Sequence, residues 1–486
     1  MPVTARYRPD PRHPDLGPAH YDRVEPARFP ETILRFRNDR WAERVGLDGL
    51  SDDEWVAHFA RFEPLPDNIE RPLALRYHGH QFRIYNPDLG DGRGFLFAQL
   101  RDARDGRLLD LGTKGSGQTP WSRGADGRLT LKGGVREILA TELLEARGVA
   151  TSKSFSLIET GEQLMRGDEP SPTRSAVLTR LSHGHVRIGS FQRLRALDET
   201  EALKRLTDHA IETYWPTAAE AADPIAALFG RVVAAVAEMG AGWMAAGFVH
   251  GVLNSDNIAI TGESFDYGPW RVQERFEPGR VAAYFDHAGL YAYARQPEAL
   301  HWNLARFAEC LLPFSSVDVL EPLLKDFADL YARALTRRTL WRLGLDPEDS
   351  QDAKGLSDAF WQAMAETRPD FERSFFDLIG GAERARIEAS PQAGLYAHAP
   401  WAELIARLRD QPLRTDPTDD AAAPFRQLAA PADLPIERVE AIWAAIDRDD
   451  DWQPLFDAVA ELRASGNAYP APDAAPRPGA GEKAGG

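Results

Sequence analysis

The chain has 486 residues, a formal net charge of −17 and a pI near 5.3. Its 43% hydrophobic and 27% charged residues are typical of a soluble globular protein, and its length suffices for two or three domain-sized units with a substantial core. The excess of acidic side chains would repel a phosphate backbone, so nucleic acid is excluded as an expected partner.

The single cysteine and the hydropathy of the chain further restrict the class of protein and its expected compartment. Cys310 is the only cysteine, which rules out an intrachain disulfide and a CxxC zinc site. The opening residues MPVTARYRPDPRHPDLGP lack an apolar core, so no targeting segment is expected. The most apolar stretch, 224–249, contains Arg231 and Glu238, which favours a buried helix over a membrane span. We therefore expect a cytoplasmic protein with no membrane partner and with a buried, unreactive thiol.

The first half of the chain is expected to be mixed α/β. Residues 1–75 contain stretches such as ETILRFRNDRWAERVGL that we interpret as helical. The segments FLFAQL at 95–100 and RLLDLGT at 107–113 predict two strands, because both are short apolar runs separated by a turn-forming Asp-Gly pair. A helix is expected at about 132–147, and SKSFSLIET and SAVLTRLSH are further strand candidates.

The second half is expected to be mainly helical. Asp223 is a good N-cap for a helix whose first residue is Pro224. The tail from Gly466 is rich in Pro, Ala and Gly and is predicted to be disordered. Helix candidates lie near 198–215, 224–246, 298–312, 317–342, 356–367, 400–409 and 436–447.

The stretch FVHGVLNSDNIAITGESFDYG, residues 248–268, carries the most suggestive chemistry. A long helix, a polar loop, a hairpin with the short strand IAI and an Asp-aromatic-Gly triplet follow in the order of the catalytic segment of protein kinases. Asn257 and Asp266 offer the oxygen ligands that Mg²⁺ prefers, and Asp256 can accept a proton from an attacking hydroxyl. We assign His250 to support of the loop. Asn-Ser-Asp-Asn is also good turn chemistry, so a purely structural hairpin stays open on these residues alone.

Upstream features fit a nucleotide site when they are taken in order. The glycines of LGDGRG, at 89–94, allow close backbone approach to phosphates, although a plain turn explains the pattern equally well. Lys114 can meet phosphate oxygens, and Glu137 on the following helix can hold it in an ion pair, as in kinases. A surface lysine and a solvated helix face are the alternatives.

Paired arginines extend this set. Arg180 and Arg187, in TRLSHGHVRIGSF, can direct two guanidinium forks at the end of a polyphosphate. The segment SRGADGR supplies Asp126 and Gly127, which form a turn by default. Each signal alone is weak, but their kinase-like order along the chain indicates nucleotide binding.

Several long motifs carry a resemblance to a known family. The segments YHGHQF, LGDGR, TKGSGQTPWSRGADGR, VREIL, RLSHGHVRIGSF, FVHGVLNSDNIAITGESFDYGPW and QPEALHWNLARF resemble the selenoprotein O family of protein adenylyltransferases, kinase-like proteins called YdiU in bacteria. The resemblance covers about residues 70–315. It implies a pseudokinase that binds ATP in reverse relative to protein kinases, transfers AMP to Ser, Thr or Tyr hydroxyls of protein substrates and releases pyrophosphate.

The resemblance also implies roles for individual residues. Lys114 and Glu137 form the ion pair, Asp256 is the proton acceptor, and Asn257 and Asp266 bind Mg²⁺, with Mn²⁺ as the alternative metal. The residues expected to bind ATP are Gly90, Gly92, Arg93, Lys114, Asp126, Gly127, Arg180, Arg187 and Asp266.

The expected fold class is α/β plus α, a two-lobed protein-kinase-like fold with helical N- and C-terminal extensions. The C-terminal region, where animal relatives carry a selenocysteine, contains neither selenocysteine nor cysteine here, which argues against a redox function tied to that position. The expected units are a helical extension (1–75), an α/β N-lobe (76–195), a helical C-lobe with the catalytic loop (196–345), a C-terminal helical region (346–465) and a disordered tail (466–486).

Two alternatives to adenylyl transfer stay open. The kinase-like order alone would equally suggest an ordinary phosphotransferase. A nucleotide-binding pseudoenzyme that acts as a scaffold is the second alternative, but a pure scaffold needs neither a metal site nor a base, and this chain carries residues for both.

Overall fold

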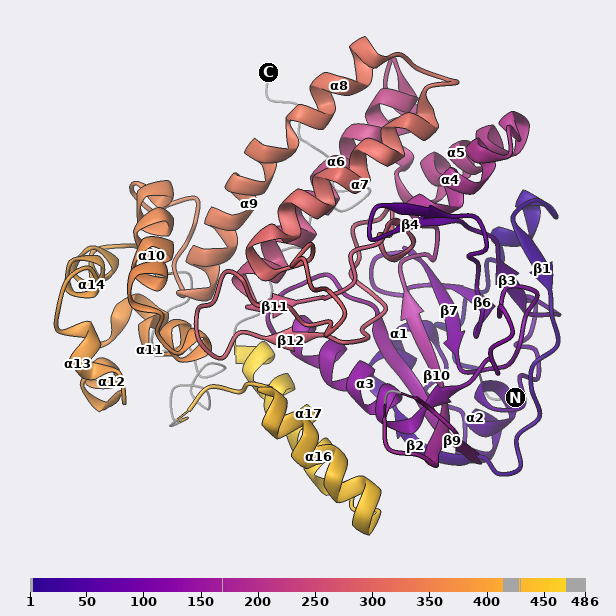
Figure 1. The fold of residues 1–486 in the computed structure, drawn as a ribbon, viewed down its shortest axis with the longest axis horizontal. Coiled ribbons are helices and arrows are strands. Elements are labelled where there is room, and N and C mark those ends of the chain that lie inside the picture. The colour runs from indigo at the N-terminus through magenta and orange to yellow at the C-terminus, as the bar shows by residue number, and fades with distance from the viewer. Residues whose placement is uncertain (1–2, 168, 414–427, 429, 469–486) are drawn as a thin grey trace.

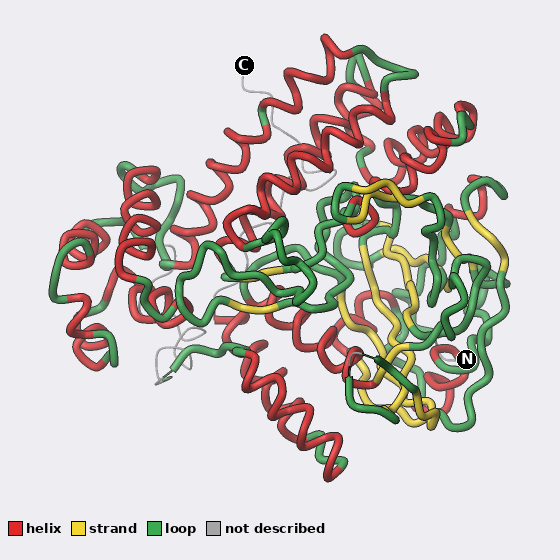
Figure 2. The backbone as a smooth tube through the Cα atoms, in the orientation of Figure 1, coloured by secondary structure: helices red, strands yellow, loops and turns green. Residues whose placement is uncertain are grey.

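The computed structural model describes residues 3–167, 169–413, 428 and 430–468. The described part is mixed α/β: the main sheet lies within the first 182 residues, and most of the chain after it is helical (Figures 1 and 2). Short 3-10 helices are η1 (His13–Leu16), η2 (Pro216–Glu220), η3 (Ser255–Asn257) and η4 (Tyr293–Arg295).

The main sheet has eight strands in the order β1-β3-β6-β7-β10-β9-β2, with β8 paired to β10, and the pairs are antiparallel. Two small hairpin-like sheets pair β4 with β5 and β11 with β12. The strands are β1 (Tyr21–Arg23), β2 (Ile33–Arg37), β3 (Leu73–Leu75), β4 (Gly79–Gln81), β5 (Ile84–Asn86), β6 (Leu96–Arg101), β7 (Leu108–Lys114), β8 (Leu129–Thr130), β9 (Lys153–Leu164), β10 (Thr173–Ser182), β11 (Phe248–Val249) and β12 (Arg271–Val272).

Most strand predictions in this part are confirmed, whereas one helix prediction and one strand prediction are wrong. The predicted strands at 95–100 and 107–113 are β6 and β7, which pair with each other. The helical interpretation of ETILRFR is wrong, because Ile33–Arg37 forms β2 and completes the sheet beside β9. The predicted strand at 258–260 is reduced to an isolated bridge between Ala259 and Arg187.

The main sheet is covered on both faces because side chains alternate along its strands. Helices α1 (Asp39–Val45) and α2 (Asp52–Phe59) share one cluster with Phe155 of β9. Helix α3 (Leu131–Ala146) shares a different cluster with Leu157, whereas the next residue of the strand, Ile158, belongs to the first cluster. The two residues are both fully buried, and α3 packs on β9 and β10. The sheet therefore holds α3 in a fixed place behind the end of β7.

The helices after the sheet follow the predictions with some differences. The candidate at 317–342 is two helices, and the helices at 188–196, 371–396 and 453–468 were not predicted. Of the predicted disordered tail, 466–468 belongs to α17 and 469–486 lies outside the described residues. The helices are α4 (Ile188–Ala196), α5 (Thr200–Tyr214), α6 (Pro224–Ala245), α7 (Gln296–Leu311), α8 (Val317–Lys325), α9 (Phe327–Arg342), α10 (Ala353–Thr367), α11 (Phe371–Ala382), α12 (Arg384–Ala389), α13 (Ala393–Tyr396), α14 (Trp401–Arg409), α16 (Ile436–Asp449) and α17 (Gln453–Ala468).

Helix α6 is the central helix of the second half. Asp223 caps it as predicted, since Oδ1 accepts hydrogen bonds from the backbone N–H groups of Ile225 and Ala226 at 3.0 Å. Among the described helices, α6 alone is long and apolar enough to cross a membrane, and most of its apolar window is buried inside the protein. It packs against α7, α8 and α9, which accounts for its apolar composition.

The C-terminal helices return to the sheet-bearing half. Figure 1 shows α16 and α17, in yellow, beside α3. Arg463 of α17 forms a bidentate ion pair with Glu142 of α3, at 2.5 and 2.8 Å. This contact joins residues more than three hundred positions apart. The C-terminal region therefore packs on the helix that carries Glu137.

Candidate active site

A large cleft opens where β7, β10, the glycine loop at 89–94 and the segment after α6 meet. Its volume is about 570 Å³. Ten of the predicted site residues line this cleft: Gly90, Gly92, Arg93, Lys114, Asp126, Gly127, Arg180, Arg187, Asp256 and Asp266. The other two are not among the lining residues: Glu137 is paired with Lys114, and Asn257 follows Asp256 on η3.

Lys114 stands at the centre of an ionic chain in the cleft. It is the last residue of β7, and its Nζ forms a very short contact with Glu137 Oε1 of α3. The same Nζ lies 2.8 Å from Asp266 Oδ1. Burial favours the neutral acid, but Lys114 and then Arg180 outweigh it and hold the pKa of Asp266 well below its usual range. Asp266 is therefore ionised in the cleft.

The two predicted arginines face the same region from neighbouring elements. Arg180 on β10 donates a hydrogen bond from Nη1 to Asp266 Oδ1 at 3.1 Å, and its buried Nε has no partner. Arg187 precedes α4, and its guanidinium lies 4.2 Å from the Tyr77 ring centroid, with Nη2 3.7 Å from Asp91 Oδ1. Both side chains are buried, so their positions are held by packing before any ligand binds.

The glycine loop and the loop after β7 form one unit. A Cβ on Gly90 would lie 2.4 Å from the Trp121 ring, so only glycine allows this contact. Thr119 Oγ1 donates to the Asp91 carbonyl at 2.6 Å, and Ser122 Oγ donates to the Gly92 carbonyl at 2.5 Å. These bonds keep the backbone of 89–94 at the edge of the cleft, where it can approach a phosphate chain.

Asp256 lies on η3 and lines the same cleft. Its side chain is buried, and its Oδ1 has no hydrogen-bond partner. Gly79 of β4 packs so closely that a Cβ there would lie 2.9 Å from this Oδ1. Burial raises the pKa of Asp256 from 3.8 to about 6, against the positive charge of Arg187. A carboxylate with a pKa near 6 is well suited to accept a proton at neutral pH.

Neighbouring polar residues hold this loop in place. His250 Nε2 donates to the Phe265 carbonyl at 3.0 Å, which links the segment before Asp256 to the residue before Asp266. Asn257 Nδ2 donates to the Val252 carbonyl at 3.1 Å, so its amide oxygen stays available as an acceptor. His250 is neutral because burial lowers its pKa.

The oxygen-bearing side chains of the cleft are suitable ligands for a hard divalent cation. In the described part of the chain, no cluster of three or more His, Cys, Asp or Glu side chains is arranged to hold a metal. The site instead offers an ionised carboxylate on Asp266, an amide oxygen on Asn257 and the unpartnered Asp256 Oδ1. The protein thus supplies only a few oxygen ligands, as it does in sites where substrate phosphates complete the coordination of Mg²⁺.

Other lining residues were not assigned a role from the sequence. Tyr77, Asp91 and Trp121 belong to motifs that were singled out, but nothing local marks these side chains as parts of the cleft. Arg128 and Arg166 also line it: Arg128 pairs with Glu162 of β9, and Arg166, just after β9, pairs with Asp126. Arg128 ends a motif that was singled out, whereas Arg166 lies outside those motifs and reaches the cleft through the fold of the sheet.

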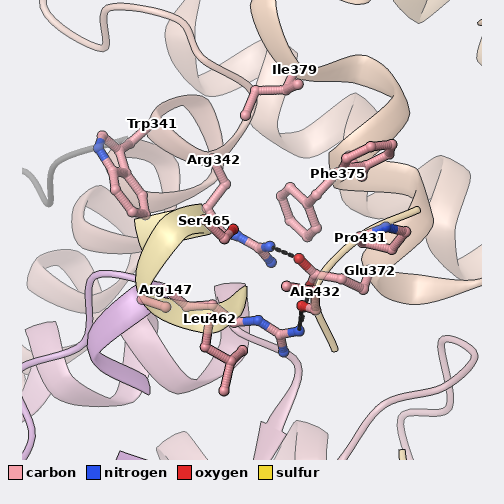
Figure 3. Close-up of a pocket in the computed structure, with 12 residues that line it drawn as sticks. Arg147, Trp341, Arg342, Glu372, Phe375, Ile379, Pro431, Ala432, Leu462 and Ser465 are labelled. Carbon is pink, nitrogen blue, oxygen red and sulfur yellow. Dashed lines mark hydrogen bonds and ion pairs between the residues drawn. The ribbon is translucent and has the colours of Figure 1, made fainter. Parts of the chain in front are cut away.

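A second, much smaller cavity shares none of these lining residues and lies between the end of α3, α9, α11, α17 and the segment before α16. Figure 3 shows that its polar side chains point toward one another. Its volume is about 40 Å³. Arg147 contacts Glu372 at 3.1 Å and Asp433 at 2.6 Å, and Arg342 contacts Glu372 at 2.5 Å. Because these charges neutralise one another, we interpret the cavity as a structural junction between these segments.

Comparisons with known proteins agree with the cleft chemistry. A family model described as Protein adenylyltransferase SelO matches residues 3–463. The protein nucleotidyltransferase YdiU of Gloeobacter violaceus is 44% identical over 471 residues, which cover 93% of this chain and 94% of that protein. Proteins of the same name from Synechocystis sp. and Rhodopseudomonas palustris are 42% and 37% identical, over 94% and 92% of this chain and 98% and 92% of their own lengths. The chain therefore belongs to the SelO (YdiU) family of protein adenylyltransferases, and it is a nucleotidyltransferase enzyme.

Proposed function

We propose that this enzyme transfers AMP from ATP to Ser, Thr or Tyr hydroxyls of protein substrates and releases pyrophosphate. The observation that carries the proposal is the arrangement of charge in the cleft. Lys114 and Arg180 contact the ionised Asp266, and Arg187 and the proton acceptor Asp256 line the same cleft. A cleft that combines several cations with one carboxylate of raised pKa suits a bound polyphosphate next to an attacking hydroxyl.

The roles of the lining residues follow from their chemistry. Gly90, Gly92 and Gly127 give the phosphates access to the backbone, and Arg93 and Asp126 line the same cleft as further nucleotide contacts. Lys114, positioned by Glu137, contributes a point charge, and the guanidinium groups of Arg180 and Arg187 bind the β- and γ-phosphates.

The transfer step needs one bond made and one broken. The acceptor oxygen attacks the α-phosphorus and forms a new P–O bond, while the bond from the α-phosphorus to the bridging oxygen breaks and pyrophosphate leaves with the electron pair. Asp256 takes the proton of the hydroxyl onto its carboxylate, which is ionised above a pH of about 6. The arginines that hold the terminal phosphates stabilise the charge that develops on pyrophosphate.

Asn257 and Asp266 are the residues that would hold Mg²⁺, with Mn²⁺ as the alternative. A bound divalent cation supplies neutralisation of phosphate charge. The proposal for these two residues is supported by the free amide oxygen of Asn257 and by the low pKa of Asp266.

The wider organisation is proposed on the same basis. A two-lobed pseudokinase fold, with lobes at 76–195 and 196–345 between helical extensions, is supported by the Lys114–Glu137 pair between strand and helix and by the position of Asp256 after a long helix. A cytoplasmic location, and an absence of nucleic-acid and membrane partners, remain expectations from composition and charge.

The decisive experiment incubates the pure enzyme and an acceptor protein with ATP labelled separately at the α- and γ-phosphates. We expect label from the α-position on protein and none from the γ-position. Arg180→Ala and Arg187→Ala should reduce this transfer on the order of 10²-fold, because each removes a donor to the leaving group. Label from the γ-position alone would reject adenylyl transfer and establish the phosphotransferase alternative.

A further inference from the structure

The cleft holds more positive charge than the proposed roles use. Seven cationic side chains line it, and five of them are paired with carboxylates of the protein. The pairs are Lys114 with Glu137, Arg128 with Glu162, Arg166 with Asp126, Arg180 with Asp266 and Arg187 with Asp91. Within the described residues, the guanidinium groups of Arg93 and Arg123 have no ion-pair or hydrogen-bond partner. Arg93 already has a proposed nucleotide contact, and Arg123 has none.

Arg123 is presented to the cleft by a tightly bonded loop. It follows Ser122, whose hydroxyl donates to the glycine loop, and Ala125 N–H donates to the Ser122 carbonyl at 2.8 Å. The backbone of Arg123 has a φ of +51°, in the left-handed region that non-glycine residues seldom adopt. Such a conformation costs of order 1 kcal/mol and is found preferentially at functional sites. The loop therefore holds an exposed arginine where a glycine would be less strained.

Arg123 shares the cleft with Asp256, the carboxylate proposed to accept the proton. Burial raises the pKa of Asp256, and the positive charges of Arg187 and then Arg123 lower it. Arg123 lines the same cleft as Asp256 and follows Ser122, which contacts the glycine loop, so a phosphate chain bound in the cleft can reach its guanidinium.

We propose that Arg123 is a further substrate-binding residue, whose guanidinium contacts the phosphoryl group under attack and stabilises its negative charge during transfer. The proposal rests on the proposed function in assigning that group as the α-phosphate. Its chemical basis is independent of the assignment, because an unpaired guanidinium fork at the mouth of a phosphate site matches two phosphoryl oxygens. Arg180 and Arg187 are paired with carboxylates of the protein, so we assign the contact with this phosphoryl group to Arg123.

The test compares Arg123→Ala and Arg123→Lys with the parent enzyme, at saturating acceptor and with varied ATP. We expect kcat/KM for ATP to fall about 10²-fold in the alanine variant, mostly through kcat, and to recover partly in the lysine variant, which keeps the charge but not the fork. Arg384→Ala removes an exposed arginine of α12, outside the cleft, and should match the parent. Unchanged urea midpoints verify that the variants are folded.

Two results would overturn the proposal. Values of kcat/KM within threefold of the parent would make Arg123 a solvated surface residue. A loss seen with an acidic acceptor peptide but not with a neutral one would assign Arg123 to the acceptor protein and not to the phosphate. The labelled-ATP assay on the parent distinguishes a failure of the proposed function from a failure of the role of Arg123. Transfer of the γ-phosphate would reject the proposed function, and the effect of the Arg123 variants on that transfer would still test the role of Arg123.

Discussion

Replacing Asp256 with asparagine is expected to stabilise the ligand-free protein at neutral pH although it slows transfer. The carboxyl is buried, its Oδ1 has no hydrogen-bond partner, and burial raises its pKa from 3.8 to about 6. A buried carboxylate that must be ionised for catalysis is a cost to the folded state. Asparagine has nearly the same shape and carries no charge to be buried.

The magnitude follows from the difference between the two pKa values. The unfolded carboxyl loses its proton near pH 3.8 and the folded one near pH 6, so the folded state binds more protons between these values. The stability that the neutral acid contributes is therefore fully present below pH 3.8 and is lost as the pH rises through about 6. Each pKa unit corresponds to about 1.4 kcal/mol, so the ionised Asp256 costs about 3 kcal/mol above that range.

Urea unfolding of the ligand-free protein, in the presence of a chelator, measures this difference at pH 4.5 and 7.5. We expect the free energy of unfolding of Asp256→Asn to exceed that of the parent by up to about 3 kcal/mol at pH 7.5 and by about 1 kcal/mol at pH 4.5. Asp329→Asn, which changes an exposed carboxylate on α9, should shift stability by less than about 0.5 kcal/mol at either pH.

The pH dependence of kcat/KM provides a second test of the ionisation of Asp256. In the parent enzyme, kcat/KM should rise with pH to a plateau with an apparent pKa near 6, because Asp256 must be ionised to accept the proton. In Asp256→Asn this rise should disappear and turnover should fall on the order of 10²-fold or more. A variant no more stable than the parent at pH 7.5, or one with full activity, would refute the reasoning.

Three further outcomes are expected. Asp266→Ala should abolish metal-dependent ATP binding, measured by calorimetry, with the fold intact. Asn257→Ala should weaken this binding less, because an amide oxygen contributes no charge. Equal losses of binding in the two variants would contradict this ranking. Burial raises the pKa of the Cys310 thiol to about 12, so activity should not respond to dithiothreitol, and a large reversible change would instead indicate an intermolecular disulfide. Glu372→Ala should lower the free energy of unfolding by about 3 kcal/mol in urea, because it leaves Arg342 without the carboxylate that Figure 3 shows beside it. A loss below about 1 kcal/mol would mean that the junction relaxes and admits water.

The sequence alone was sufficient for the parts of this protein whose signals are local. Apolar runs and a turn pair predicted β6 and β7, helical periodicity predicted α3, and the motif at 248–268 identified the segment that carries Asp256 and Asp266. The same motifs, taken in order, identified the family that the comparisons confirm. Local patterns succeed here because turn chemistry, capping and short-range periodicity depend on neighbouring residues only.

Tertiary structure decided the features that depend on distant contacts. ILRFR at 33–37 became a strand because β9 offers it a pairing edge, and a five-residue run with two arginines does not reveal that edge. The raised pKa of Asp256 arises from burial of η3 against β4 and α4, which its flanking turn residues do not indicate. Arg463 of α17 meets Glu142 of α3, and Arg166 reaches the cleft, only after remote segments come together. Burial and ion pairing are set by the whole fold, so the electrostatics of the site cannot be obtained from spacing along the chain.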